Sequence, residues 1–242
     1  MTNTSSHSRA SFFELCRNFG RKMLLTVFKK EYQKSMHTRG PSIDTRYLEY
    51  PFVLRNLELE KGRKILDVGC VGTPFPLILA SLGYQTYGID IREWSGKLQY
   101  PNFHFIKEDM RRTSFPDEFF ERITAVSTIE HIGLSGRYGS DEDLDGDKKA
   151  VKEMRRILKR GGKIFITVPY GEAKIIRPFH RVYDQKMLQE LLHGLRIEKE
   201  EYYIKKNNSW LSASKSEAEK VKSTEVERTK AFACLKISKQ EE

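Results

Sequence analysis

Residues 64–72, Lys-Ile-Leu-Asp-Val-Gly-Cys-Val-Gly, constrain the fold more than any other stretch of this chain. A short apolar run carries an acid, Asp67, and leads into a turn of small residues. This pattern is typical of a buried parallel strand that precedes a ligand-binding loop. About twenty residues later, a second apolar strand at 87–91 contains Asp90. Two strand-end acids at this spacing indicate a site for the ribose of a nucleoside.

From Lys64 onward, strand patterns alternate with helix patterns, which predicts a doubly wound α/β fold with a mostly parallel sheet of about seven strands. The predicted strands are 64–68, 85–90, 103–107, 121–127, 163–168, 196–204 and 231–238. The predicted helices are 43–59, 75–82, 147–159 and 185–192. The last two strands are expected to close the sheet as an antiparallel pair. Residues 207–229 between them are rich in Ser, Lys and Glu and are predicted to be an exposed excursion, part helix and part loop.

The positive charge is unevenly distributed along the 242 residues. The net charge is +10, and residues 1–40 contribute +6 of it through eight Lys/Arg against two Glu. We therefore predict a basic helical arm with a disordered start over 1–40 and a single catalytic domain over 41–242. Because the excess charge belongs to the arm, nucleic acid is not the expected partner of the domain. The sequence does not indicate an oligomeric state.

The arm contains an apolar stripe at helical spacing within residues 11–35, flanked by Lys and Arg. One interpretation is a helix that lies on an anionic membrane surface. The other is a helix that docks on the domain and covers the ligand cleft. Three widely spaced cysteines fit a reducing compartment, and neither a secretory signal nor an apolar run of about 20 residues is found. The predicted location is cytoplasmic, with peripheral contact at the inner membrane surface under the first interpretation.

The loop after the first strand, Gly69-Cys-Val-Gly72-Thr-Pro74, has G-x-x-G spacing. A dinucleotide fingerprint would read G-x-G-x-x-G and place a pyrophosphate on a helix N-terminus. Pro74 and Pro76 make this turn stiff and leave few amides for a phosphate. The pattern therefore favours a nucleoside without phosphate and disfavours a nicotinamide oxidoreductase.

The order of these elements resembles the class I S-adenosylmethionine-dependent methyltransferases, whose sheet is Rossmann-like. The matching segments are 65–70, 87–90, 107–110, 115–121, 127–132 and 153–169. Segments 46–50, 137–139 and 178–183 resemble, more loosely, a branch linked with surface-glycan assembly. The resemblance implies S-adenosyl-L-methionine as the cofactor.

The resemblance also assigns cofactor-binding roles. Asp67 and Gly69 match the first motif, which backs onto the methionine part, and Asp90 matches the acid that accepts hydrogen bonds from the ribose hydroxyls. Asp109 matches the acid beside the adenine amino group, with Met110 packed near the ring. Ser127 matches the position where cofactor and substrate meet.

The first-motif loop departs from the family pattern at one position. Val71 stands where the family carries its second glycine, and Gly72 follows one place later. A β-branched residue resists positive φ. Either the loop is shifted so that Gly72 serves, or the affinity for the cofactor is reduced.

The acceptor side of the site is expected after the fourth strand. Histidine has an intrinsic pKa suited to a general base, which makes His131 a candidate for that role, and a structural role is the alternative. Further candidate substrate residues are Arg137, Tyr138, His180 and Arg181. They would hold a polar or anionic acceptor, or else brace the loops that carry them.

No metal site is predicted. The acids in residues 141–147 are spaced as in a calcium-binding EF-hand loop. However, Lys152 occupies the position of the bidentate Glu, and no helix pattern precedes the loop. We expect Asp147 to cap the helix that begins at Lys148.

The predicted function is methyl transfer from S-adenosylmethionine to a small molecule or sugar, at oxygen. One alternative is a cofactor-binding module with lost or regulatory chemistry. Another is an RNA or protein methyltransferase that uses the basic arm.

Overall fold

The computed structural model describes residues 45–96, 100–135, 138–139, 141–225 and 229–239. The predicted arm at 1–40, with its helix at 11–35, lies outside these residues, as does Arg137. None of the helices in the described part of the chain combines the length and apolar character that crossing a membrane requires.

Among the described residues, an eight-stranded sheet has the order β3-β2-β1-β4-β5-β10-β8-β9. The parallel strands are β1 (Lys64–Val68), β2 (Gln85–Asp90), β3 (Phe103–Lys107), β4 (Phe120–Val126) and β5 (Leu158–Pro169). The antiparallel strands are β8 (Leu195–Lys206), β9 (Ser209–Ala213) and β10 (Ala231–Lys239). The doubly wound, mostly parallel sheet predicted from the sequence is confirmed.

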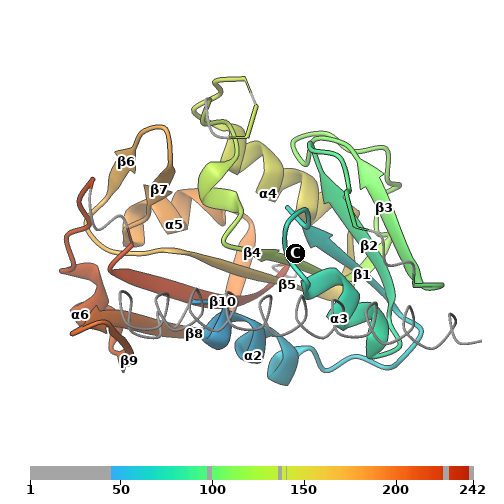
Figure 1. The fold of residues 1–242 in the computed structure, drawn as a ribbon, viewed down its shortest axis with the longest axis horizontal. Helices are drawn as coiled ribbons and strands as arrows, with labels where there is room; N and C mark the ends of the chain where they lie inside the picture. Colours follow the sequence, from blue (N-terminus) through green and yellow to red (C-terminus); the bar gives the residue numbers. More distant parts are fainter. Residues whose placement is uncertain (1–44, 97–99, 136–137, 140, 226–228, 240–242) are drawn as a thin grey trace, which may run out of the picture. The chain divides into compact units, whose positions relative to one another are not determined.

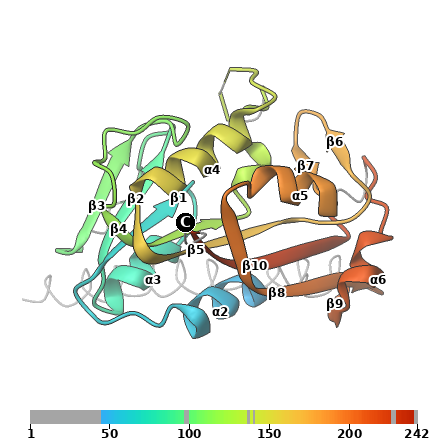
Figure 2. The same ribbon diagram turned by 180° about the vertical axis from the view of Figure 1, so that it is seen from behind.

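Helices cover both faces of the sheet (Figures 1 and 2). One face carries α2 (Arg46–Asn56) and α3 (Phe75–Ser81), and the other carries α4 (Gly146–Ile157) and α5 (Gln185–Leu191). The remaining elements are a 3-10 turn η1 (Ile129–His131), the hairpin β6 (Lys174–Ile176) and β7 (His180–Val182), and α6 (Lys215–Glu219).

An apolar core lies on each side of the sheet. On one side, Phe52 of α2 packs edge-on against Phe165 of β5, with ring centroids 6.5 Å apart. On the other side, α4 buries Val151, Met154 and Ile157, whose spacing of three places them on one helix face. Burial of the sheet on both faces explains why consecutive residues of its central strands are buried, as in β1 and the second half of β5.

The junction between α4 and β5 differs from the prediction. The helix ends at Ile157 rather than 159, and the strand begins at Leu158 rather than 163. Leu158 pairs with Phe120 of β4, and the register then shifts before Arg122 pairs with Lys163. Gly161, at φ +71°, lies within this irregularity. Gly161 and Gly162 therefore lie in a distortion inside β5.

The segment 207–229 also differs from the prediction, because β9 extends the sheet. Lys206 of β8 pairs with Ser209 of β9 across the two residues Asn207 and Asn208, which have φ of +49° and +61°. Positive φ at both central residues is typical of a two-residue hairpin turn, and Asn favours it. The Asn-Asn pair was the sequence signal for this hairpin.

Candidate functional site

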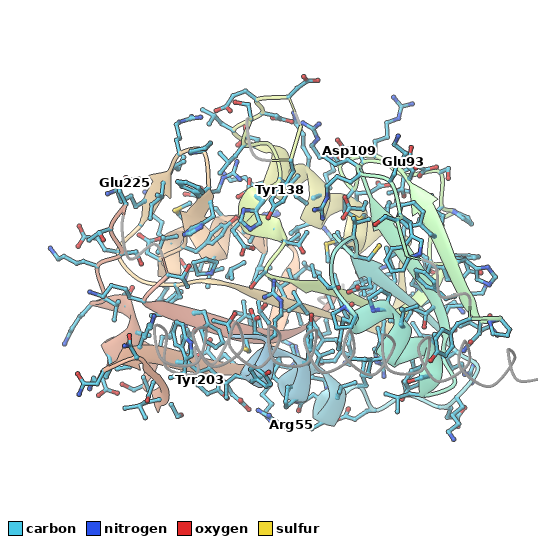
Figure 3. The ribbon with its side chains drawn as sticks, viewed as in Figure 1. Arg55, Glu93, Asp109, Tyr138, Tyr203 and Glu225 are labelled. Atoms are coloured by element: carbon cyan, nitrogen blue, oxygen red, sulfur yellow. The ribbon has the colours of Figure 1, made fainter. Side chains whose placement is uncertain are left out.

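The candidate site lies at the carboxyl ends of β1, β2, β3 and β4. The strand order reverses between β1 and β4, which is where open α/β sheets bind ligands. A cavity of about 290 Å³, here called the cofactor cavity, opens at this edge. Its lining includes the predicted residues Gly69, Gly72, Asp90, Asp109, Met110, Ser127, His131 and Tyr138. Figure 3 labels Asp109 and Tyr138 on the same side of the sheet.

The loop after β1 uses Gly72 where the family pattern has its second glycine. Gly69 and Gly72 have φ of +73° and +86°, whereas Val71 is not among the described residues with positive φ. A side chain on Gly69 would meet Thr128, because a Cβ there would lie 2.4 Å from Thr128 Cγ2. A Cβ on Gly72 would meet nothing within 4 Å. The positive φ therefore falls on Gly72 and not on Val71, which agrees with the shifted-loop alternative.

Asp67 is buried and does not line the cofactor cavity. The residue is 3% exposed, and Thr124 Oγ1 donates a hydrogen bond of 2.7 Å to Asp67 Oδ1. Burial raises the pKa of Asp67 to about 7.

Asp90 ends β2, and its carboxylate is fully engaged within the chain. Arg92 donates to Oδ1 from its backbone nitrogen (2.9 Å) and Nε (3.0 Å), and to Oδ2 from Nη2 (2.8 Å). The N–H of Val71 donates a further bond of 3.0 Å to Oδ2. A carboxylate offers about four lone-pair sites. A ribose hydroxyl must therefore displace the Arg92 side chain to bind Asp90.

Asp109 follows β3 and is held in the same way by Arg111. The Arg111 side chain donates to Asp109 Oδ2 from Nε (3.0 Å) and Nη2 (2.7 Å), and its backbone nitrogen donates to Oδ1 (2.9 Å). Burial alone would raise the pKa of Asp109, but the Arg111 hydrogen bonds outweigh it and the pKa lies below its ordinary value. Both nucleoside-binding candidates are thus acids paired with the arginine two residues later.

Ser127 follows β4 in a conformation that favours glycine, with φ +45°. Its hydroxyl donates to Glu49 Oε1 at 2.6 Å, and Thr167 Oγ1 donates to the same oxygen at 2.6 Å. Arg46 binds the other oxygen, Glu49 Oε2, at 2.5 Å. Glu49 is fully buried, so α2 is tied through this one carboxylate to the ends of β4 and β5. Strained residues that are held by several contacts are common in functional sites.

His131 lies beside Ser127 at the wall of the cofactor cavity. Its Nδ1 is 2.5 Å from the carbonyl oxygen of Phe179, and its Nε2 is 3.7 Å from Glu130 Oε1. The ring packs edge-on against Tyr138, with centroids 5.2 Å apart. The guanidinium of Arg92 lies 4.8 Å from the centroid of the same Tyr138 ring.

A second cavity, of about 280 Å³, adjoins the first and is here called the acceptor cavity. It shares Arg46, Ser127 and His131 with the cofactor cavity and adds Glu49, Glu130 and His180. His180 is 5% exposed, and its ring centroid lies 6.0 Å from that of His131. The structure thus brings His131 and His180 together, as the sequence-based grouping expected.

Arg181 lines neither cavity. It is 1% exposed, and its guanidinium donates to the backbone oxygens of Ile132 (2.7 Å) and Leu144 (3.1 Å). Its Nε also lies 3.4 Å from Asp147 Oδ2, which accepts a bond from Tyr183. Its donors are therefore engaged in bracing a loop, which was the alternative to substrate binding. The predicted cap at Asp147 is wrong, because α4 begins at Gly146 and Asp147 is buried within its first turn.

The sequence analysis missed Arg46, Glu49, Arg92 and Arg111 as residues of the site. Arg92 and Arg111 carry a visible signal, since Asp-x-Arg follows both β2 and β3. Arg46 and Glu49 precede the first strand and reach the site only through the fold. Within the described residues, no cluster of side chains has the composition of a metal site.

Two curated relatives are methyltransferases by name. The chain is 29% identical over 140 residues to sterol 24-C-methyltransferase ERG6B of Gibberella zeae, a match that covers 51% of this chain and 32% of that protein. It is 22% identical over 209 residues to the ubiquinone/menaquinone biosynthesis C-methyltransferase UbiE of Vibrio parahaemolyticus. That match covers 76% of this chain and 74% of that protein. The chain thus spans about a third of the length of the sterol enzyme.

A solved structure shares the fold. The 1,6-didemethyltoxoflavin-N1-methyltransferase of Burkholderia thailandensis, crystallised with 1,6-didemethyltoxoflavin and S-adenosylhomocysteine, aligns with a TM-score of 0.54 at 11% identity. The alignment covers 100% of this chain and 93% of that chain.

The fold, the strand-end site and these relatives resemble the class I S-adenosylmethionine-dependent methyltransferases, the class that the sequence analysis predicted. A family model described as "Caenorhabditis protein of unknown function, DUF268" matches residues 104–235, more than half of the chain. The chain belongs to this family.

Proposed function

We propose that this chain binds S-adenosylmethionine in the cofactor cavity and transfers its methyl group to an oxygen of a small molecule. The observation that carries the proposal is the pair of acids, Asp90 and Asp109, at the ends of the adjacent strands β2 and β3 in one cavity. The other side chains of that cavity are suited to the remaining parts of the cofactor.

The adenosine part fits the β2 and β3 side of the cofactor cavity. Asp90 would accept hydrogen bonds from the vicinal ribose hydroxyls, and Asp109 would accept one from the adenine amino group. Ile91 and Met110 supply apolar surface for the ring. A volume of about 290 Å³ is at the lower end for ligand pockets. Displacement of the Arg92 side chain would enlarge it.

The amino-acid part fits the β1 and β4 side. Arg46 lines the cavity there, and its guanidinium would pair with the cofactor carboxylate while it stays bound to Glu49. The φ values of Gly69 and Gly72 bring the loop backbone to the cavity wall. When bound, the cofactor supplies a methyl group on a sulfonium, which is an electrophile.

Two features support a small-molecule acceptor methylated at oxygen. The acceptor cavity is small and adjoins the cofactor cavity through Ser127 and His131. His131 could remove the proton of a hydroxyl group during methylation at oxygen. A carbon acceptor has no hydroxyl proton at the reacting atom. The relatives named above carry C-methyltransferase in their names, so the choice of oxygen depends on the geometry of His131.

Calorimetric titration of the full chain with S-adenosylmethionine and S-adenosylhomocysteine tests the cofactor part. We expect both to bind, and Asp90→Asn to weaken both by about tenfold or more through loss of a charged acceptor. The matched control is Asp117→Asn, an exposed acid paired with Arg156 away from both cavities. Failure of the native chain to bind either compound would overturn the proposal. Binding without turnover on any acceptor would favour a module that has lost its chemistry.

A further inference from the structure

We propose that the acceptor cavity takes an uncharged, hydroxyl-bearing molecule, and that Nε2 of His131 receives the proton of the methylated hydroxyl. This inference rests on the proposed function and names the substrate class and the base for the same site. It is carried by the position of the cavity, by its charges and by the tautomer of His131.

The position of the acceptor cavity is suited to methyl transfer. Arg46, Ser127 and His131 line both cavities, so a molecule in either one contacts the same three side chains. Transfer from a sulfonium is an in-line displacement and depends mainly on holding the two reactants next to each other. Two adjoining cavities with a common wall provide this arrangement.

The charges of the acceptor cavity disfavour an anionic ligand. Its guanidinium, that of Arg46, already binds Glu49 at 2.5 Å, so the two charges compensate each other. Glu130, a residue that is 2% exposed, also lines the cavity, and among the described residues of the lining no Arg or Lys is present besides Arg46. In its ionised form Glu130 would repel a phosphate or carboxylate. Hydroxyl groups, in contrast, can donate hydrogen bonds to carboxylates and to imidazole nitrogens.

The hydrogen bond of His131 fixes its tautomer. A carbonyl oxygen can only accept, so the contact of 2.5 Å between Nδ1 and Phe179 O requires a proton on Nδ1. A neutral ring then has its lone pair on Nε2. Glu130 Oε1 lies 3.7 Å from this nitrogen and would stabilise the imidazolium that forms when Nε2 gains a proton. Glu130 is therefore a positioning residue for the base.

The atoms and electrons of the step balance without a further reactant. A bond forms between the acceptor oxygen and the methyl carbon, while the bond between that carbon and sulfur breaks. The electron pair of the broken bond stays on sulfur, which becomes a neutral thioether. The hydroxyl proton moves to Nε2 of His131 and later passes to water.

The first test reads the histidine directly and needs no activity. Nitrogen-15 NMR of the cofactor-free full chain, labelled at histidine and assigned with His131→Asn, reports which ring nitrogen holds the proton. We expect His131 to be protonated on Nδ1 and unprotonated on Nε2 in its neutral form. A neutral His131 with its proton on Nε2 would overturn the assignment of the base.

The second test measures transfer to probes of different charge. Glycerol and methyl α-D-glucoside are the uncharged probes, glycerol 3-phosphate and glucose 6-phosphate are their anionic counterparts, and mass spectrometry follows S-adenosylhomocysteine. We expect the uncharged probes to react at least about tenfold faster. At saturating cofactor, His131→Asn should lower that rate by about 100-fold or more. The matched control, His193→Asn, changes an exposed histidine outside both cavities and should leave the rate unchanged.

The outcomes separate this inference from the function on which it rests. Preference for the phosphorylated probes, or full activity of His131→Asn, would overturn the inference alone. Cofactor binding without transfer to either uncharged probe would also overturn it, and the cofactor site would stand. Absence of cofactor binding would overturn the proposed function itself.

Discussion

Arg92 is expected to compete with the cofactor for Asp90. Two of the hydrogen bonds that Asp90 accepts come from the Arg92 side chain, at 3.0 and 2.8 Å. Asp90 is 6% exposed, so its carboxylate depends on partners within the protein when no ligand is bound. In Arg92→Ala the ligand-free state loses these partners. A ribose would restore hydrogen bonds to Asp90, so we expect the variant to bind S-adenosylmethionine more tightly than the native chain.

The size of the effect follows from the exposure of the pair. Hydrogen bonds to charged groups contribute about 1.5–3 kcal/mol. The Arg92 side chain is 37% exposed, and water compensates part of the loss, which leaves about 1 kcal/mol. This corresponds to a dissociation constant lowered about fivefold. Without ligand, the free energy of unfolding of Arg92→Ala should be about 1 kcal/mol lower than that of the native chain.

Calorimetry at two salt concentrations provides the assay. Salt weakens the Arg92–Asp90 pair, so cofactor affinity should rise with salt in the native chain and change little in Arg92→Ala. The matched control is Arg63→Ala, which removes an exposed pair with Glu60 outside the cavity. A fivefold or greater loss of affinity in Arg92→Ala would refute the reasoning, because Arg92 would then hold the cofactor itself.

Four further substitutions test the surroundings of the site. Between about pH 4 and pH 7 native Asp67 holds a proton that the unfolded chain releases, so the free energy of unfolding should fall as pH rises. In urea titrations at several pH values, Asp67→Asn should abolish this fall and be up to about 4 kcal/mol more stable at pH 8. Gly69→Ala should lower the free energy of unfolding by about 3 kcal/mol, because the added methyl group would meet Thr128. Gly72→Ala should lower it by about 1–2 kcal/mol, through the positive φ alone. Equal losses in urea unfolding would contradict the close approach of Gly69 to Thr128. Arg181→Met should cost about 3–5 kcal/mol in the same assay, and a loss below 1 kcal/mol would show that its buried bonds are dispensable.

The acids at the strand ends could be predicted because local pattern determines them. Asp90 and Asp109 follow short apolar runs, and the carboxyl ends of neighbouring parallel strands must meet at one edge. Gly72 was one of two alternatives, and it required the backbone angles of the loop to be decided. The hairpin at Asn207 and Asn208 was also within reach of the sequence, since two adjacent Asn residues favour such a turn.

The contacts between distant segments could not be predicted. Glu49 meets Ser127 and Thr167 only after α2 has packed against the sheet, and no local pattern marks a helical Glu as buried. From the sequence, Arg181 was an equally good candidate for binding a substrate or for bracing its loop. Its burial in the structure favours the bracing role. The acceptor cavity likewise depends on how η1, β7 and α2 meet, which no single segment specifies.

A crystal structure of the full chain, grown with saturating S-adenosylhomocysteine, tests the central claim most directly. The structure predicts that the ribose lies on Asp90, that adenine lies beside Asp109 and Met110, and that the Arg92 side chain leaves the Asp90 carboxylate. If the cofactor cavity remained without the compound while Arg92 stayed on Asp90, or if the compound bound elsewhere, the assigned site would be contradicted.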